Sequence, residues 1–292
     1  MSVDHYENFP VASWLCPPAL RPAIAALYHY ARTADDIADE GDAPAPERLA
    51  RLADYRGELL RSLQGPASAR QPSAPAPHPE WGWIFERLAG AIAAHRLPLQ
   101  PLLDLLDAFE QDVRNPPYAD RPALLDYCRR SANPVGRLLL HLWGVDDLRS
   151  HRESDAICTA LQLINFWQDF SIDHARGRCY VPHADARAHG LDPLTLPQAS
   201  DSPATQALVA DLCHWARGLM LSGQGLPLRV GGRAGWELRL VVQGGLRILE
   251  KIEQMEHRSL HRRPRLNALD LPVMLWRALR MRPSDVRGPA SA

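Results

Sequence analysis

The stretch SDAICTALQLINFWQDFSID, residues 154–173, decides the fold of this chain. Its apolar residues surround most of a helix, as in a central, buried helix; they are Ile157, Leu161, Leu163, Ile164, Phe166, Trp167, Phe170 and Ile172. One polar line runs among them, made of Gln162, Asn165, Asp169 and Asp173. Because carboxylates in a dry core are costly unless paired or coordinated, this line predicts a cavity that holds cations or water. The alternative is a surface helix whose polar stripe meets solvent.

A second acidic cluster, Asp35, Asp36 and Asp39, lies earlier in the chain, on the same side of an expected helix as Tyr28 and Arg32. Like charges one turn apart destabilise an isolated helix, so we expect cations between the two clusters. Hard oxygen ligands with no His or Cys beside them indicate magnesium, which usually shares its shell with phosphates. Arg32 is either a salt-bridge partner of these carboxylates or a ligand for a phosphate oxygen.

The rest of the chain predicts further helices, joined by breaks at proline and glycine. They span residues 20–38, 46–63, 81–95, 99–113, 122–132, 135–143, 205–222 and 236–257. Gly244 and Gly245 fall inside the last of these, where they indicate close helix packing, extra room in a cavity wall, or a break in the helix. We expect a proline-rich loop insertion at 64–79, a loop at 189–203 and a flexible tail at 281–292. Strand patterns are nearly absent, so we predict an all-α fold with one domain over residues 1–280.

The composition limits the possible functions. The formal net charge of -1 gives no sign of a nucleic-acid footprint or a polybasic membrane patch. The five cysteines are odd in number and widely spaced, so we expect buried thiols rather than disulfides or zinc ligands. We find no signal peptide and no apolar run that could span a bilayer, so we expect a cytoplasmic protein, at most peripheral on a membrane.

Other classes of helical protein fit less well. A ferritin-like di-iron protein needs Glu-x-x-His pairs and a zinc hydrolase needs His-Glu-x-x-His, and the sequence has neither motif. A helical interaction protein would explain the helices but not two aspartate rows in apolar surroundings.

Together, these motifs resemble the squalene/phytoene synthase family, the head-to-head branch of the class I isoprenoid synthases, over about residues 7–265. The first motif is Tyr28-x-x-x-Arg32-x-x-Asp35-Asp36-x-x-Asp39. The second is Gln162-x-x-Asn165-x-x-x-Asp169-x-x-x-Asp173, followed by Arg176-Gly177-Arg178-x-Tyr180-x-Pro182. Within the family, residues 7–13, 31–40, 130–136 and 165–169 are most similar to the bacterial hopanoid-pathway enzyme that makes hydroxysqualene from presqualene diphosphate.

The resemblance implies a helical domain around a central cavity, with the two acidic clusters at its mouth. It implies magnesium ions held by Asp35, Asp39, Asn165, Asp169 and Asp173, with Asp36 supporting the first cluster. The catalytic set would be Asp35, Asp36, Asp39, Asp169 and Asp173. The substrate-binding set would be Tyr28, Arg32, Gln162, Asn165, Arg176 and Arg178.

The same resemblance implies an activity. Presqualene diphosphate would ionise, and one water would capture the rearranged cation to give hydroxysqualene without NADPH. The main alternative is the condensation of two farnesyl diphosphates to presqualene diphosphate, or a squalene- or phytoene-type synthesis. Because such substrates are lipids, we expect loose attachment to the inner face of the cytoplasmic membrane. We also expect a functional link to other enzymes of squalene and hopanoid synthesis.

Overall fold

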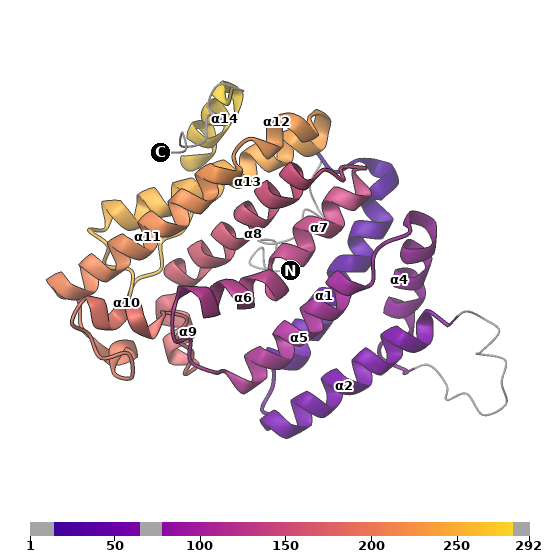
Figure 1. Cartoon of the computed structure of the whole chain (residues 1–292), viewed down its shortest axis with the longest axis horizontal. Coiled ribbons are helices and arrows are strands. Elements are labelled where there is room, and N and C mark those ends of the chain that lie inside the picture. Colours follow the sequence, from indigo (N-terminus) through magenta and orange to yellow (C-terminus); the bar gives the residue numbers. More distant parts are fainter. Residues whose placement is uncertain (1–14, 65–77, 283–292) are drawn as a thin grey trace. The chain divides into compact units, whose positions relative to one another are not determined.

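The computed structural model describes residues 15–64 and 78–282 (Figure 1). The described residues form helices and turns and contain no strand, which confirms the predicted all-α class. Contacts divide the chain into two compact units, Met1–Pro116 and Pro117–Ala292. The similar stretch at 7–13, most of the expected insertion at 64–79 and most of the expected tail at 281–292 lie outside the described residues.

The first unit is built around α1. Its helices are η2 (Pro18–Leu20), α1 (Arg21–Asp39), α2 (Ala45–Ser62), α4 (Gly82–His95) and α5 (Gln100–Arg114), and α1 contacts α2, α4 and α5. Two buried tyrosines fix the inner side of α1. The Tyr30 hydroxyl donates to the Leu102 carbonyl at 2.8 Å, and the Tyr55 hydroxyl donates to the Tyr30 carbonyl at 3.1 Å. Burying this side leaves Tyr28, Arg32, Asp35 and Asp39 only partly covered.

Both ends of α1 follow the expected signals. Pro22 lies in the first turn, where its missing N–H costs nothing. The helix ends at Asp39, and Gly41 follows with a φ of 80°, a left-handed conformation that favours glycine. The sequence therefore places the first acidic cluster in the last turn of a helix.

The second unit is built around α8. Its helices are α6 (Arg121–Ser131), α7 (Asn133–Leu142), α8 (Leu148–Gln168), α9 (Phe170–Ala175), α10 (His183–Ala188), η3 (Leu196–Gln198), α11 (Pro203–Gly223), α12 (Leu226–Val230), α13 (Gly232–Gln254) and α14 (Asp270–Arg280). Helix α8 contacts α6, α7, α11, α12 and α13, and Figure 1 shows it running between α7 and α11. The expected central, buried helix is confirmed within this unit.

Glycines let the helices of the second unit approach α8 closely. A Cβ atom at Gly136 of α7 would collide with the Ser154 side chain, and one at Gly223 of α11 would lie 2.5 Å from the Glu153 carbonyl oxygen. A Cβ atom at Gly245 of α13 would lie 3.2 Å from the side chains of Leu161 and Ile164 on α8, and 2.8 Å from the Met220 methyl group on α11. Helix α13 runs through Gly245 without a break, so the expected break is wrong and these contacts indicate close packing there.

The structure corrects some predicted boundaries. Helix α8 begins at Leu148 rather than at residue 154, because the Asp147 side chain accepts the Ser150 N–H at 2.9 Å and caps the helix. The expected single helix over 154–173 is interrupted at Asp169, whose ψ of 14° departs from helical geometry. Helices α10, α12 and α14 were not predicted. None of the five cysteines, all within the described residues, is in a disulfide; Cys16, Cys128 and Cys213 are buried, as expected, whereas Cys158 and Cys179 are half-buried.

Candidate active site

The first acidic cluster lies where a helix least tolerates negative charge. Asp35, Asp36 and Asp39 occupy the last turn of α1, which contains no basic residue. The C-terminus of a helix carries a partial negative charge, so carboxylates there are unfavourable unless cations offset them. Arg32 supplies part of that compensation. Its guanidinium lies 3.0 Å from Asp35 Oδ2, 2.5 Å from Asp36 Oδ1 and 2.7 Å from Glu40 Oε1.

Arg32 is therefore a salt-bridge partner of these carboxylates, the first of the two expected alternatives. Three carboxylates converge on this one guanidinium, and a second arginine, Arg48, donates to the Ala38 carbonyl at the same end of α1 at 2.6 Å. Tyr28 lies one turn before Arg32, half-buried, with its ring 5.5 Å from the His29 ring.

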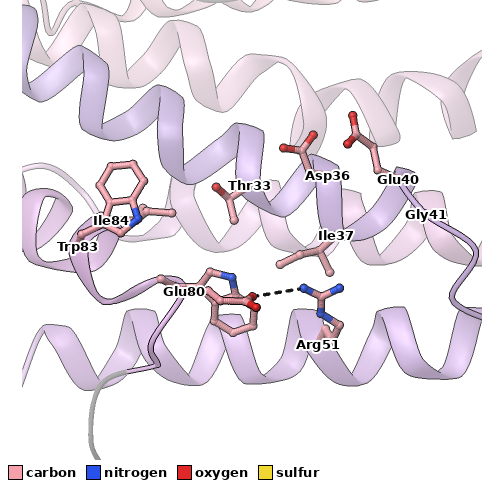
Figure 2. A pocket seen from close by; sticks show the side chains of 10 residues that line it. Thr33, Asp36, Ile37, Glu40, Gly41, Arg51, Glu80, Trp83 and Ile84 are labelled. Atoms are coloured by element: carbon pink, nitrogen blue, oxygen red, sulfur yellow. Dashed lines mark ion pairs between the residues drawn. The ribbon is translucent and has the colours of Figure 1, made fainter.

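Asp36 differs from the other members of its cluster. It lines an open hollow with Thr33, Ile37 and Glu40, and Figure 2 shows these side chains beside the ion pair of Arg51 and Glu80. Burial raises the pKa of Asp36, and this effect outweighs the lowering by Arg32. Asp35 and Asp39 do not line this hollow. The row formed by successive turns of α1 thus comprises Arg32, Asp35 and Asp39, with Asp36 at its edge.

The predicted polar line of the second unit is present. Gln162, Asn165, Asp169 and Asp173 are each partly exposed, whereas Leu163, Ile164, Phe166, Trp167, Gln168 and Phe170 are buried. The four residues stay aligned on one side despite the interruption of the helix at Asp169. The Asp169 N–H donates to the Asn165 carbonyl at 2.9 Å, and the Asp173 N–H donates to the Asp169 carbonyl at 2.9 Å, so each residue stays one turn from the next.

An arginine that the sequence did not single out holds the second acidic cluster. Arg263, in the connection between α13 and α14, donates from Nε to Asp169 Oδ1 and from Nη2 to Asp169 Oδ2 at 3.1 Å. The Asp169 side chain is only 14% exposed. Burial raises the pKa of Asp169 and outweighs the lowering by Arg263, Arg265 and Arg176. In the sequence, the one indication that this segment contacts an acidic cluster is its richness in arginine over residues 258–265.

The segment Arg176-Gly177-Arg178 folds back on the end of α9. Gly177 has a φ of 73°, and the Arg178 N–H donates to the Asp173 carbonyl at 2.8 Å. This turn holds the backbone of Arg178 against the end of the helix that carries Asp173. The second unit therefore brings Asp169 together with Arg263 and Arg176, and places Arg178 next to Asp173.

The donor chemistry of the two clusters fits magnesium. Each helix presents two carboxylates one turn apart, and no group of three or more His, Cys, Asp or Glu residues that could hold a metal ion occurs in the described parts of the chain. Magnesium is usually bound in proteins by one or two carboxylates and completes its shell with phosphate and water.

Comparisons with known proteins agree with these motifs. A family model described as squalene/phytoene synthase matches residues 3–270. A hydroxysqualene synthase from Zymomonas mobilis subsp. mobilis is 40% identical over 60% of this chain and 54% of that enzyme. A second, from Rhodopseudomonas palustris, is 32% identical over 98% of this chain and 93% of its own length. A presqualene diphosphate synthase from Zymomonas mobilis is 29% identical over 73% of this chain and 68% of that enzyme.

A solved structure has the same fold. The crystal structure of squalene synthase HpnC from Alicyclobacillus acidocaldarius superimposes with a TM-score of 0.74 and 35% sequence identity, over 87% of this chain and 90% of that one. The family model covers nearly the whole chain, including both aspartate motifs and Arg263. The chain therefore belongs to the squalene/phytoene synthase family and is an isoprenoid-processing enzyme.

Proposed function

We propose that this protein catalyses the magnesium-dependent conversion of presqualene diphosphate to hydroxysqualene. The observation that carries the proposal is the likeness to hydroxysqualene synthases, one of them 32% identical over 98% of this chain. The presqualene diphosphate synthase is similar over less of the chain and at lower identity.

The arginines would bind the diphosphate. Arg32 and Arg263 are already oriented by carboxylates, and a guanidinium can exchange such a partner for a phosphate oxygen while keeping its bidentate geometry. Arg176 and Arg178 add positive charge beside Asp173. Tyr28 and Gln162 would donate further hydrogen bonds. When the arginines turn to the substrate, the carboxylates of Asp35 and Asp169 lose their guanidinium partners and become available as metal ligands.

Magnesium would be held by Asp35, Asp39, Asn165, Asp169 and Asp173, with Asp36 in support at the edge of the first cluster. Bound there, it supplies Lewis-acid stabilisation of the charge on the leaving diphosphate.

The reaction begins with cleavage of the C–O bond, whose electron pair leaves with the diphosphate. Arg32, Arg176, Arg178 and Arg263 stabilise the negative charge that develops on the leaving oxygen. The cyclopropylcarbinyl cation opens, one water adds its oxygen to the carbon chain, and loss of a proton from that water gives the alcohol. Because this capture replaces hydride transfer, no NADPH is consumed. The apolar sides of α8 that flank the polar line would keep bulk water from the cation.

The alternative activity, condensation of two farnesyl diphosphates to presqualene diphosphate, is favoured by the presqualene diphosphate synthase relatives. A direct test incubates the purified protein with magnesium and either substrate, without NADPH, and identifies the products by mass spectrometry. We expect hydroxysqualene from presqualene diphosphate. Accumulation of presqualene diphosphate from farnesyl diphosphate would instead establish the alternative.

A location follows from the same chemistry. A substrate with long prenyl tails partitions into lipid, so the enzyme would work at the inner face of the cytoplasmic membrane, beside other enzymes of squalene and hopanoid synthesis.

A further inference from the structure

Helix α14 buries only one side, and that side is fixed by polar contacts to α13. Asp270 lies 2.8 Å from Arg247 Nε and 2.9 Å from Lys251 Nζ, while Arg239 Nη1 donates to the Ala278 carbonyl at 3.2 Å. These contacts pin both ends of α14, antiparallel to α13. They determine which residues of α14 point outward.

The outward side of α14 is apolar. We call Leu269, Leu271, Leu275, Trp276 and Leu279 the α14 apolar face; these side chains are between 41% and 82% exposed. Apart from Leu269, which directly precedes the helix, their spacing places them on one side of α14. Single exposed leucines are ordinary, whereas a contiguous apolar face on a helix indicates an interaction surface.

Basic residues predominate in the segment that carries this face. Residues 258–282 contain seven arginines, and Asp270, which is buried, is the only acidic residue among them. Three of these arginines form ion pairs with carboxylates outside the segment: Arg258 with Glu256, Arg263 with Asp169 and Arg277 with Glu250. The whole-chain charge of -1 therefore conceals an excess of arginine in the C-terminal region. Arg280 lies over the Trp276 ring at 4.6 Å, and Arg239 lies over the half-exposed Trp236 ring of α13 at the same distance.

This combination fits a membrane surface. Leucine and tryptophan side chains enter the boundary between headgroups and acyl chains, while arginines at the rim reach the phosphates of anionic lipids. Among the helices that the structure describes, none has the length and apolarity needed to cross a bilayer.

Other occupants fit less well. Residues 283–292, PSDVRGPASA, contain one large apolar side chain, Val286, and offer little to cover four leucines and a tryptophan. A second copy of the chain would bring arginine-rich rims together, and like charges facing each other disfavour association.

We propose that the α14 apolar face and its arginine rim dock this protein on the surface of an anionic phospholipid bilayer. The connection from α13 to α14 carries both Leu266, 41% exposed, and Arg263, which holds Asp169. One segment thus links the docking surface to the acidic cluster. This step rests on the function proposed above, in which a substrate taken from the bilayer would reach the acidic cluster that Arg263 contacts.

The test measures partition of the purified full chain onto vesicles by co-sedimentation, with phosphatidylcholine alone or mixed with phosphatidylglycerol. The test variant is Leu275→Ser with Leu279→Ser, which removes apolar area without adding charge. The matched control is Leu148→Ser with Leu194→Ser, because these leucines are each 77% exposed in the same unit but outside α14. Arg280→Gln probes the rim.

We expect the wild type and the control pair to bind the phosphatidylglycerol vesicles and to bind phosphatidylcholine much less. The α14 pair should lower the partition coefficient about tenfold or more. Arg280→Gln should lower it by about fivefold. Circular dichroism verifies that each variant is folded.

Three results would overturn the proposal. The wild type could fail to bind anionic vesicles, or the α14 pair could bind as well as the control. The α14 pair could also convert a dimer to a monomer in analytical ultracentrifugation while vesicle binding stays unchanged, which would identify a second copy as the partner. None of these readouts requires turnover, so loss of vesicle binding and failure of the proposed reaction can be told apart.

Discussion

Replacement of Arg263 by methionine tests the contact that joins the α13–α14 connection to the second acidic cluster. The substitution keeps much of the apolar stem but removes both donors to the Asp169 carboxylate. Asp169 is 14% exposed and Arg263 21% exposed, so water screens the pair only partly. The variant leaves a largely buried carboxylate with no guanidinium to offset its desolvation.

The size of the effect follows from the two hydrogen bonds. A hydrogen bond to a charged group contributes about 1.5–3 kcal/mol, and partial exposure places this pair at the lower end. We therefore expect Arg263→Met to lower the free energy of unfolding by about 2–3 kcal/mol in magnesium-free buffer at pH 7. Asp169→Asn should have a smaller effect, because the amide still accepts one hydrogen bond.

The assay is urea unfolding in the presence of a chelator, arranged as a double-mutant cycle of Arg263→Met and Asp169→Asn. Arg262→Met serves as the control, since Arg262 is exposed in the same segment. We predict a coupling energy of about 1–2 kcal/mol between Arg263 and Asp169. A coupling below about 0.5 kcal/mol would refute the inference that this pair stabilises the metal-free site.

Two further predictions concern the second unit. Gly223→Ala should lower the free energy of unfolding by about 1–3 kcal/mol, because the added Cβ would lie 2.5 Å from the Glu153 carbonyl oxygen. Gly218→Ala, in the same helix but with open space around the added Cβ, should leave the free energy of unfolding unchanged or raise it by up to about 1 kcal/mol. Equal effects of the two glycine substitutions in denaturant unfolding would contradict the packing of α11 on α8. Burial alone raises the pKa of Asp270, but hydrogen bonds from Lys251, Asn267 N–H and Arg247 outweigh it and hold the pKa at about 2. Because the pKa of Asp270 is lower in the folded protein than the unfolded value of about 3.9, its ionised carboxylate stabilises the fold at pH values above that, and this contribution is lost as the pH falls toward 2. Asp270→Asn should therefore destabilise the protein at pH 7 and progressively less between pH 4 and pH 2. A pH-independent difference between wild type and Asp270→Asn in thermal unfolding would contradict this assignment.

Local periodicity was sufficient to predict the helices that carry the aspartates. The apolar residues on both sides of Asn165 and Asp169 indicate a buried helix, and the structure places α8 at the centre of the second unit. Pro22 and Gly41 likewise mark the two ends of α1. These features depend on residues within a few turns of each other, which is the range over which sequence patterns are informative.

Contacts between distant segments could not be predicted in this way. Arg263 reaches Asp169 across 94 residues, and its position depends on how α13 and the following connection pack. The Gln168 amide fixes that connection by donating to the Pro264 carbonyl at 2.9 Å, a contact with no local signature. Helix α14 was missed for another reason. Leu271, Leu275 and Leu279 all point outward, so the helix lacks the polar exposed side that normally identifies a surface helix.

The central claim is that both carboxylate pairs are needed for magnesium-dependent ionisation of a prenyl diphosphate. The most direct measurement compares product formation from presqualene diphosphate by Asp35→Asn and Asp169→Asn across a magnesium titration. Asp54→Asn and Asp201→Asn, at exposed positions in the two units, are the controls. We predict that each site variant loses about 10²–10³-fold in kcat while the controls keep wild-type turnover. Full magnesium-dependent turnover in either site variant would contradict the account.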